Sequence, residues 1–525
     1  MKKNLALAVL VVLLLVNLLA RDEDIWNQEV DKFSSILGLI EKSYYRDVEP
    51  EKLVYSSIRG MLDTLDPHSY FLDPDSFSRM REEYTGKYYG LGIQIQKQED
   101  NLVVVSPIEG TPASRLGIQP GDIISTINGE STKPISSFEA MQKLRGPKGT
   151  KVTITILREG LEAPLELTIE REEIPLRSVP YAFLINNDTG FIFIRNFAET
   201  TTQEFEEKMK ALTAQGLKSL VLDLRWNTGG TFFQSVDLSD EFLPSGAVIV
   251  SIKGRNRIYN REYRADTNNQ YEHIPLVILI NRGSASASEI VAGAVMDNDR
   301  GYIVGEDSWG KGLVQTVFPL GDNLAVALTT AKYFTPSGRS IQRDYQHIED
   351  YLMHKQAPED QREVRYTVNG RKVLGQGGIS PDFEIPQTVS TQVLELMSRA
   401  AFFGYARKFA AHQTPLAKDF VFPRDEGLNG PAAPGKTVVT KDFVVDDAVI
   451  ADFQGYLLAN KITVEEDKFK AARDEVRREL QRNIFSLLWN VEEGVKAFCK
   501  LDPAVLKAIE VMPEAAKFVG NTKTP

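Results

Sequence analysis

The chain has 525 residues, of which 42 % are hydrophobic and 25 % are charged, and its formal net charge is −11. At roughly 150 residues per domain this length predicts three or four folded domains, and the average composition excludes a mainly disordered or polytopic membrane protein. The 61 basic against 72 acidic residues exclude the positive surplus of a dedicated nucleic-acid binder. With Cys499 as its single cysteine and no Cys/His cluster at metal-ligand spacing, the sequence predicts neither disulfide, metal nor other cofactor.

The first 21 residues have the features of an export segment. Lys2 and Lys3 precede a run of apolar residues that ends at Ala20. The sixteen residues from Leu5 to Ala20, all apolar except Asn17, rise about 24 Å as a helix. This is a little less than the roughly 30 Å hydrocarbon core, so the run fits a signal peptide or a short anchor. A poor cleavage site favours an uncleaved anchor over residues 4–20, with secretion after cleavage as the alternative. Either way, we expect the chain from Arg21 onward to be periplasmic or at the cell surface.

Residues 22–85 place apolar side chains at helical spacing, as at Ile25, Phe33 and Ile40, and predict a helical stalk or dimerisation element. Residues 86–172 predict a small β-rich domain, because short β-patterned runs alternate there with Gly, Pro and Asn turns. Its expected strands cover 93–96, 102–105, 122–127 and 152–157.

Residues 173–387 alternate buried strands with helical patterns, which predicts an α/β layered core. Its expected strands cover 190–194, 220–224 and 275–280, and its expected helices cover 202–215 and 286–296. Residues 388–525 are predicted as a mainly helical extension. It comprises a helix over 391–411, a Pro/Gly/Ala-rich linker over 429–435 and a charged helix over 464–485. The alternating charges of the last helix predict a solvated face, with an adaptor or oligomer contact as the alternative.

The glycines at the start of the β-rich domain predict an anion-binding loop. In the segment Gly90–Ile93 they allow consecutive backbone N–H groups to converge on one point. A peptide carboxylate fits there, while the rest of the peptide adds as a strand to the sheet edge. With the capped turn and Pro-Gly turn over 111–124, the segment resembles a PDZ domain, whose carboxylate-binding loop corresponds to Leu91, Gly92 and Ile93. For the short motif alone, an ordinary β-turn is the alternative.

Ser286 is predicted at the start of a helix that follows a buried strand and a glycine turn. The unpaired N–H groups and the dipole at such a position stabilise an oxyanion, which acyl transfer requires. The small neighbours Ala285 and Ala287 leave room for a substrate backbone. However, Ser286 and Glu289 also form the S-x-x-E pattern of a capping box, so this segment alone does not separate catalysis from helix capping.

Lys311 lies between two glycines, after a predicted strand. The stretch Gly305–Lys311 matches the G-x-x-x-x-G-K of a phosphate-binding loop. Gly312 then stands where Ser or Thr should bind magnesium, and strand-like residues follow where a helix should begin, so we expect no nucleotide. A solvated lysine on a tight turn is the structural alternative.

In the kind and order of these motifs, the chain closely resembles the C-terminal processing peptidases, also called tail-specific proteases. A PDZ-like domain is followed by S-A-S-A-S-E around Ser286 and by G-K-G-x-x-Q from Gly310 to Gln315. The resemblance extends over about residues 30–387. It implies an α/β-layered protease core of the αββ type with an inserted PDZ-like domain, whereas residues 388–525 are unmatched. Supporting motifs lie at 65–69, 223–230, 336–342 and 378–383.

By this resemblance Ser286 is the nucleophile, Lys311 is the general base and Gln315 orients the lysine. An ordinary lysine is protonated at neutral pH, so we expect burial or nearby positive charge to lower the pKa of Lys311. In a regular strand Lys311 and Gln315 would lie roughly 13 Å apart. Their contact therefore needs a bend, which Gly312 would permit.

The resemblance also implies an oxyanion hole built from backbone N–H groups. One donor is Ala287 and the other is Gly229 or Gly230, and the sequence leaves the choice between these glycines open. Asp223 and Arg225 are expected to fix the same loop through a local ion pair rather than to transfer protons.

His68 and Asp66 raise the alternative of a Ser-His-Asp triad in an exported protein. The D-P-H-S stretch is typical of a turn, and neither G-x-S-x-G nor G-N-S-G-G occurs in the chain. The sequence therefore favours the serine and lysine pair.

The combined prediction is an extracytoplasmic serine endopeptidase that captures unstructured protein C-termini and cleaves through an acyl-enzyme. Its expected partners are those C-termini, the membrane through the N-terminal segment, and a homo-oligomer or an adaptor. Two other interpretations stay open. One is a non-catalytic scaffold that binds C-termini, and the other is a carrier of lipophilic ligands, as in the retinoid-binding relatives of this family. The presence of Ser286, Lys311 and Gln315 together favours the peptidase.

Overall fold

The computed structural model describes residues 25–158, 160–266, 270–387, 389–423 and 436–519. The predicted export segment and the linker over 429–435 lie outside these ranges. Within them, no helix has the length and apolar character needed to cross a bilayer. The chain divides into two compact units, residues 1–74 with 317–328 and residues 75–316 with 329–525.

The first unit contains the predicted helical region. Residues 25–43 form one helix, and α2 (Pro50–Asp63) and β1 (Tyr70–Leu72) follow. Strand β1 pairs antiparallel with residues 325–327. The helix over 25–43 exposes large apolar side chains, among them Trp26 and Leu39. The helices are confirmed, while the role of this region in dimerisation stays a prediction.

The β-rich domain of the second unit follows α3 (Pro74–Thr85) and forms a sheet in the order β3-β4-β5-β7-β8, with β6 paired to β5. Strand β3 is therefore an edge strand. The two helices of the domain are α4 (Pro112–Arg115) and α5 (Ser137–Leu144). Strand β2 (Lys87–Gly90) enters the domain and pairs with β9 (Glu172–Pro175), which leaves it. The sheet strands are β3 (Ile93–Gln98), β4 (Asn101–Pro107), β5 (Ile123–Ile127), β6 (Glu130–Ser131), β7 (Lys151–Leu157) and β8 (Leu165–Glu170).

The α/β core is built on a six-stranded sheet in the order β10-β11-β12-β15-β16-β21. All neighbours from β11 to β21 are parallel, and β10 is antiparallel to β11. The loops after parallel strands meet at one sheet edge, where α/β proteins place their sites. The strands are β10 (Tyr181–Leu184), β11 (Thr189–Phe193), β12 (Ser219–Asp223), β15 (Leu276–Ile280), β16 (Tyr302–Gly305) and β21 (Phe383–Glu384).

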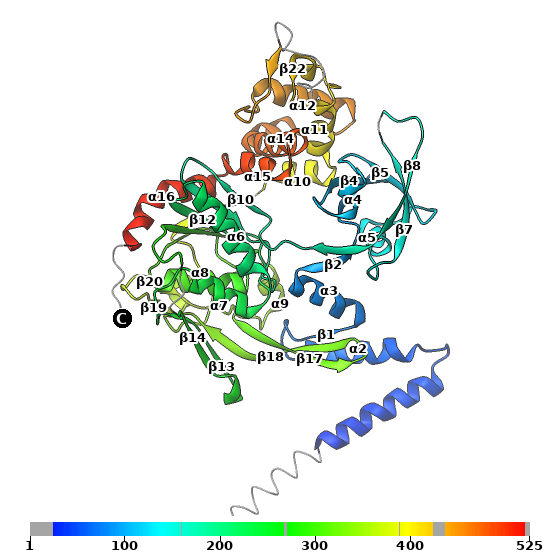
Figure 1. Cartoon of the computed structure of the whole chain (residues 1–525). Coiled ribbons are helices and arrows are strands. Elements are labelled where there is room, and N and C mark those ends of the chain that lie inside the picture. Colours follow the sequence, from blue (N-terminus) through cyan, green and yellow to red (C-terminus); the bar gives the residue numbers. More distant parts are fainter. Residues whose placement is uncertain (1–24, 159, 267–269, 388, 424–435, 520–525) are drawn as a thin grey trace, which may run out of the picture. The chain divides into compact units, whose positions relative to one another are not determined.

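Helices cover both faces of this sheet, and its strand β15 is accordingly apolar and buried at every position. Leu220 and Leu222 of β12 face the core that includes α6 (Thr201–Ala214), α7 (Phe232–Asp240) and α8 (Ala287–Asp297). Val221 faces the other side and packs with residues of α16 (Pro503–Val519). Figure 1 shows α16, drawn in red, on the opposite side of the sheet from α8. The last helix of the chain thus completes the α/β core.

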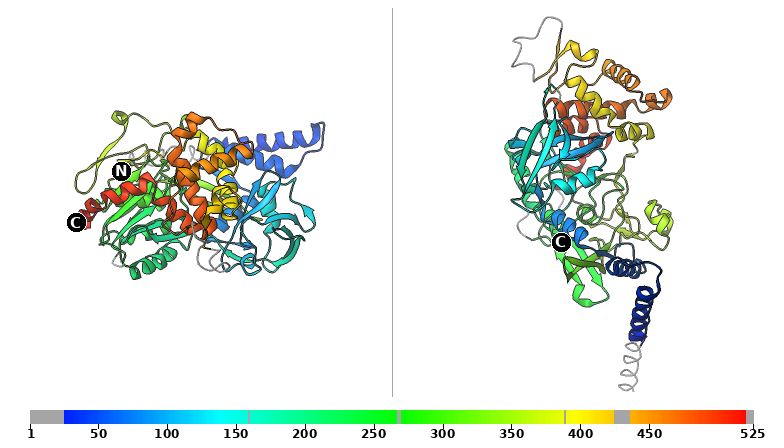
Figure 2. Two further views of the ribbon diagram at one scale, coloured as in Figure 1. Left: turned by 90° about the horizontal axis from the view of Figure 1, so that it is seen from above. Right: turned by 90° about the vertical axis from the view of Figure 1, so that its right-hand side faces the viewer.

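The helices before α16 form a bundle with a core of their own, visible in yellow and orange in Figure 2. Two single helices predicted there are wrong, because the chain breaks each into two. The helix predicted over 391–411 ends at Ser398 and resumes at Ala401, with Ala400 in the left-handed region (φ +51°). The helix predicted over 464–485 is interrupted at Ala472. The bundle helices are α10 (Thr391–Ser398), α11 (Ala401–Ala410), α12 (Asp447–Ala459), α13 (Glu466–Ala471), α14 (Arg473–Leu488) and α15 (Val491–Cys499).

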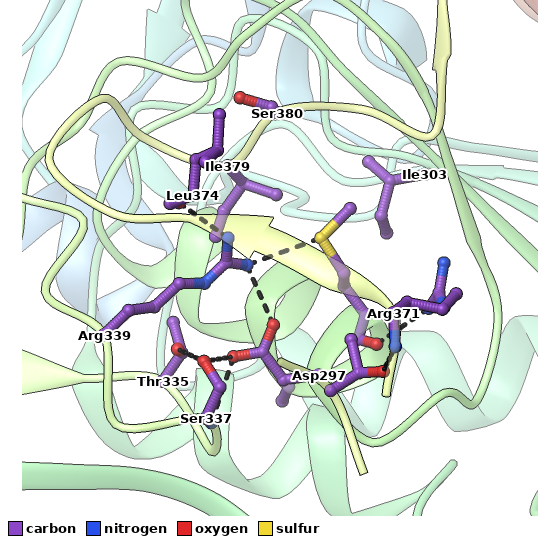
Figure 3. A network of polar contacts seen from close by, with 12 residues as sticks. Asp297, Ile303, Thr335, Ser337, Arg339, Arg371, Leu374, Ile379 and Ser380 are labelled. Carbon is purple, nitrogen blue, oxygen red and sulfur yellow. Dashed lines mark hydrogen bonds and ion pairs between the residues drawn. The ribbon is translucent and has the colours of Figure 1, made fainter. Parts of the chain in front are cut away.

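A second sheet contains β13 (Val248–Gly254), β14 (Arg261–Arg264), β17 (Leu313–Gly321) and β18 (Leu324–Phe334). After β18 the motif over 336–342 places Arg339 in a buried ion pair with Asp297, at 2.8 Å, where α8 ends (Figure 3). Ser337 donates its hydroxyl to the same carboxylate at 2.6 Å. This motif therefore fixes the carboxyl end of α8.

Candidate active site

Ser286 occupies the turn between β15 and α8, immediately before the first residue of the helix, as the sequence predicts. Its backbone has φ +55° and ψ −112°, a strained conformation for a residue with a side chain. Such strain persists only where surrounding contacts impose it. Here the Ser286 N–H donates to Oε2 of Glu289 at 2.8 Å. The S-x-x-E pattern thus holds the backbone of Ser286 through the Glu289 carboxylate.

Glu289 does more than cap α8, because its fully buried carboxylate joins two loops. Oε2 accepts the N–H of Ser286 and, at 2.9 Å, the N–H of Lys311. Oε1 accepts the N–H of Gly310 at 2.7 Å and the hydroxyl of Ser308 at 2.5 Å. The sequence predicts only a capping role for Glu289. Its place at the end of the S-A-S-A-S-E motif was the signal for a wider role.

Tyr333 holds the same two residues from the carbonyl side. Its hydroxyl lies 3.2 Å from the carbonyl oxygen of Ser286 and also within hydrogen-bond distance of the carbonyl oxygen of Lys311. The side chain is 1 % exposed. Glu289 and Tyr333, which we call the Glu289–Tyr333 clamp, therefore fix the backbones of Ser286 and Lys311 relative to each other.

Lys311 is half-buried and precedes strand β17, which confirms that the segment does not continue as a phosphate-loop helix. The glycine in the left-handed region is Gly310 (φ +84°) rather than Gly312. The N–H of Gly312 donates to Oε1 of Gln342 at 2.8 Å. Further along β17, the Gln315 amide donates to Oγ1 of Thr329 at 3.2 Å.

The loop after β12 brings Gly229 and Gly230 to Ser286. A Cβ added at Gly229 would lie 2.9 Å from Cβ of Ser286 and 3.1 Å from the nitrogen of Ala287. A Cβ added at Gly230 would lie 2.0 Å from the carbonyl oxygen of Phe197. Both positions also have positive φ, so only glycine fits either of them.

The hydrogen bonds of this loop distinguish the two glycines. The N–H of Gly229 already donates to Oδ1 of Asn227 at 2.9 Å. The N–H groups of Gly230 and Ala287, by contrast, have no acceptor among the described residues. Asn227 is itself fixed, since its carbonyl accepts the N–H of Ala285 at 2.9 Å. Gly230 and Ala287 thus leave two backbone N–H groups without an acceptor among the described residues, whereas the N–H of Gly229 is engaged.

The ion pair expected between Asp223 and Arg225 is present at 2.7 Å, and Arg225 also pairs with Asp502 at 2.8 Å. Burial lowers the pKa of Arg225, but the carboxylates of Asp223 and Asp502 raise this pKa by more than burial lowers it. The net shift is upward, so the guanidinium stays charged. Asp502 also accepts the N–H of Ala504 at 2.8 Å and so caps α16. No sequence pattern indicates a role for Asp502, which lies 277 residues from its partner Arg225.

The predicted peptide-binding residues Leu91, Gly92 and Ile93 line a pocket of about 250 Å³, together with Met141 and Leu144 of α5. The N–H groups of Leu91 and Gly92 donate to no acceptor in the described ranges. Because β3 is an edge strand, its free side is open to an added strand.

His68, which the sequence raised as a member of an alternative Ser-His-Asp triad, lies in a turn. Its backbone N–H donates to Oδ1 of Asp66 at 2.8 Å. As for metal ions, no group of three or more His, Cys, Asp or Glu side chains in the described part of the chain is arranged to hold one.

Comparison with known proteins identifies the family. The profile of peptidase family S41 matches residues 188–350, the PDZ domain matches residues 80–157, and the activating protease CtpB N-terminal domain matches residues 17–76. The carboxy-terminal-processing protease of Bartonella bacilliformis is 40 % identical over 319 residues, which are 60 % of this chain and 73 % of that protein. The chain belongs to the carboxy-terminal processing proteases of peptidase family S41.

A second relative in sequence agrees with this assignment. Carboxy-terminal processing protease CtpA of Bacillus subtilis is 34 % identical over 60 % of this chain and 67 % of its own. Among solved structures, a photosystem II D1 C-terminal processing protease is 28 % identical and covers 69 % of this chain and 94 % of its own, with a TM-score of 0.36. The family and the fold class predicted from the motifs, an α/β protease core with a PDZ domain and a helical C-terminal region, are confirmed.

The clamp of this S41 family member gives its stability a pH dependence. Burial raises the pKa of the Glu289 carboxyl to about 7. The four hydrogen bonds that the carboxylate accepts lower this pKa, but the effect of burial is larger. An unfolded glutamate titrates near pH 4.3, so the contribution of Glu289 to folding is fully present below about pH 4.3 and is lost as the pH rises through about 7. We expect the free energy of unfolding of the wild type, relative to Glu289→Gln, to fall by roughly 3–4 kcal/mol across this window. Urea unfolding of both proteins at several pH values measures it, and a constant difference would contradict the assignment.

Proposed function

We propose that this chain is an extracytoplasmic serine endopeptidase that uses Ser286 and Lys311 as a catalytic dyad. The observation that carries the proposal is the Glu289–Tyr333 clamp, which fixes the backbones of these two residues against each other. The N–H groups of Ala287 and Gly230 supply a second reason, because they lie beside Ser286 with no acceptor among the described residues. A non-catalytic scaffold would have no use for a strained serine held in this way.

In the proposed reaction, Oγ of Ser286 attacks the carbonyl carbon of the scissile bond while Nζ of Lys311 takes the hydroxyl proton. The carbonyl oxygen becomes an oxyanion, which accepts hydrogen bonds from the N–H groups of Ala287 and Gly230. When the intermediate collapses, Lys311 gives its proton to the leaving amine. Water then attacks the ester on Ser286, again with Lys311 as base, and releases the second product. Gln315 is proposed to orient the lysine amine.

The PDZ domain is proposed to bind the free C-termini of unstructured proteins. The N–H groups of Leu91 and Gly92 would receive the carboxylate, and the peptide would extend the sheet along the open side of β3. The pocket lined by Ile93, Met141 and Leu144 would take an apolar terminal side chain. Tethering one end of the substrate raises its concentration at Ser286.

We further propose that residues 4–20 anchor the protein to the cytoplasmic membrane, with the enzyme on the outer side. The support is the basic, then apolar, N-terminal sequence. An oligomer through the N-terminal helices is proposed on their exposed apolar side chains. An adaptor contact is proposed on the alternating charges over residues 464–485 of the helical extension.

Amidation of the substrate C-terminus tests this function. The purified full-length chain, in detergent and with a chelator present, is mixed with an unstructured protein that ends in apolar residues, and the fragments are followed by mass spectrometry. Removing the terminal charge weakens charge-assisted hydrogen bonds worth about 1.5–3 kcal/mol, so we expect kcat/KM to fall roughly 10- to 100-fold. Acetylating the substrate N-terminus is the matched control and should change nothing. Equal rates with and without the free carboxylate would refute the PDZ assignment, and an intact substrate would refute the peptidase.

A further inference from the structure

A second pocket, of about 370 Å³, opens where the core sheet meets the helical extension. Its inner wall comes from the ends of β10 and β11, through Tyr181 and Phe193. Its outer wall comes from α14 and α15, through Arg482 and Phe498. The volume lies within the range of small-molecule and side-chain sites. The mechanism described above does not use this pocket.

Trp226 lines this pocket and belongs to the loop that carries Gly230. Its φ is +61°, a strained value for an aromatic residue, and it is 58 % exposed. Its N–H donates to Oδ1 of Asn281 at 2.9 Å, and its backbone and ring pack so closely on Gly283 that a Cβ there would lie 2.5 Å from the indole ring. A strained aromatic side chain that is rigidly held but left exposed indicates a contact surface for a ligand.

The distance between Trp226 and Ser286 indicates which kind of ligand can contact both residues. Trp226 precedes Gly230 by four residues, and Gly283, on which it packs, precedes Ser286 by three. An extended chain spans at most about 3.6 Å per residue, so Gly283 lies within about 11 Å of Ser286, and the part of the indole that packs on Gly283 lies within roughly 15 Å of it. A peptide bound at Ser286 covers that distance with about four of its own residues.

The pocket has an apolar part that suits a peptide side chain and a charged part. The charged part is lined by Asp223, Arg225, Glu475, Arg478, Glu479, Arg482 and Asp502. The aromatic rings of Tyr181, Phe193 and Phe498 offer apolar contacts. Gln387 adds one buried donor, since its Nε2 has no hydrogen-bond partner among the described residues, while its Oε1 accepts the amide of Asn281 at 3.5 Å. A buried donor of this kind needs a partner, which a peptide carbonyl oxygen supplies.

We propose that this Trp226 pocket is a substrate subsite that selects a large apolar side chain, aromatic above all, within about four residues of the scissile bond. The inference rests on the proposed endopeptidase. The side chain stacks on the Trp226 indole and enters the pocket, and Gln387 donates to the adjacent peptide carbonyl. The subsite is shared between the α/β core and the helical extension, so the extension takes part in choosing where the substrate is cut.

Matched peptides test the proposal. Each of the four positions on either side of the cleaved bond is either Ala or Phe, and kcat/KM is measured with the full-length chain. At one position we expect Phe to exceed Ala by about tenfold or more in the wild type. Trp226→Ala should reduce this Phe/Ala ratio below about threefold, and Trp226→Phe should largely retain it. Leu458→Ala, which removes an exposed leucine of α12, is the matched control and should leave the ratio unchanged.

A binding measurement separates this inference from the proposed function. The Ser286→Ala protein binds the intact peptides without turnover, and calorimetry gives the ratio of the affinities for the Phe and Ala peptides, with and without Trp226→Ala. A wild type without preference at any position, or a preference that survives Trp226→Ala in a folded protein, overturns the subsite. If the binding preference depends on Trp226 but the wild type cleaves none of the peptides, the result supports the Trp226 pocket as a peptide-binding site and refutes only the proposed peptidase activity.

Discussion

Ser286→Ala and Lys311→Ala are each expected to lower kcat by at least about 10³-fold on an unstructured substrate with a free carboxylate. The first variant removes the proposed nucleophile and the second removes the proposed base. Because the two side chains act as one unit, the double variant should be no slower than either single variant. Initial rates by mass spectrometry, with thermal unfolding to confirm folding, measure these effects.

The controls are the exposed residues Ser398 and Lys332, each changed to alanine, which should retain full activity. Substrate binding supplies an independent readout. The catalytic variants should still bind the free C-terminus, because the PDZ pocket is formed by other residues. A folded Lys311→Ala protein that cleaves at the wild-type rate would overturn the dyad while leaving the S41 family assignment intact.

Removal of residues 503–525 is expected to abolish cooperative folding of the α/β core. This truncation deletes α16, whose buried Val505, Val511 and Met512 cover one face of the six-stranded sheet. Fully burying a side chain of this size stabilises a fold by about 1.5–3 kcal/mol, so three of them approach the roughly 5–15 kcal/mol of a whole domain. The truncated sheet would also expose Val221 and its neighbours to solvent.

The truncation is measured by solubility and by thermal unfolding. Removal of residues 520–525 alone is the matched control, since α16 ends at Val519, and it should unfold like the wild type. A soluble 1–502 chain with a wild-type unfolding transition would contradict the role assigned to α16. The comparison also tests whether the extension is an appended domain or a layer of the core.

Much of this protein is determined by local sequence. The strands around Leu220 and Ile278 are recognisable because their apolar runs and flanking turns are properties of consecutive residues. The same holds for the helix that begins after Ser286. The PDZ loop and the peptidase motifs are also short segments, so the family could be recognised before any fold was known. Two long helices were predicted wrongly, because the breaks at Ala400 and Ala472 fall on residues that favour helix.

Only the tertiary structure decided how the site is held. Tyr333 and Glu289 clamp Ser286 to Lys311, yet Tyr333 lies 47 residues from Ser286 in the chain. Gly229 differs from Gly230 in that its N–H donates to Oδ1 of Asn227. These features, like the pairing of Arg225 with Asp502 and the cover provided by α16, are contacts between distant segments. Sequence periodicity reports which residues are buried, but the partner that each buried residue meets is fixed only when the chain has packed.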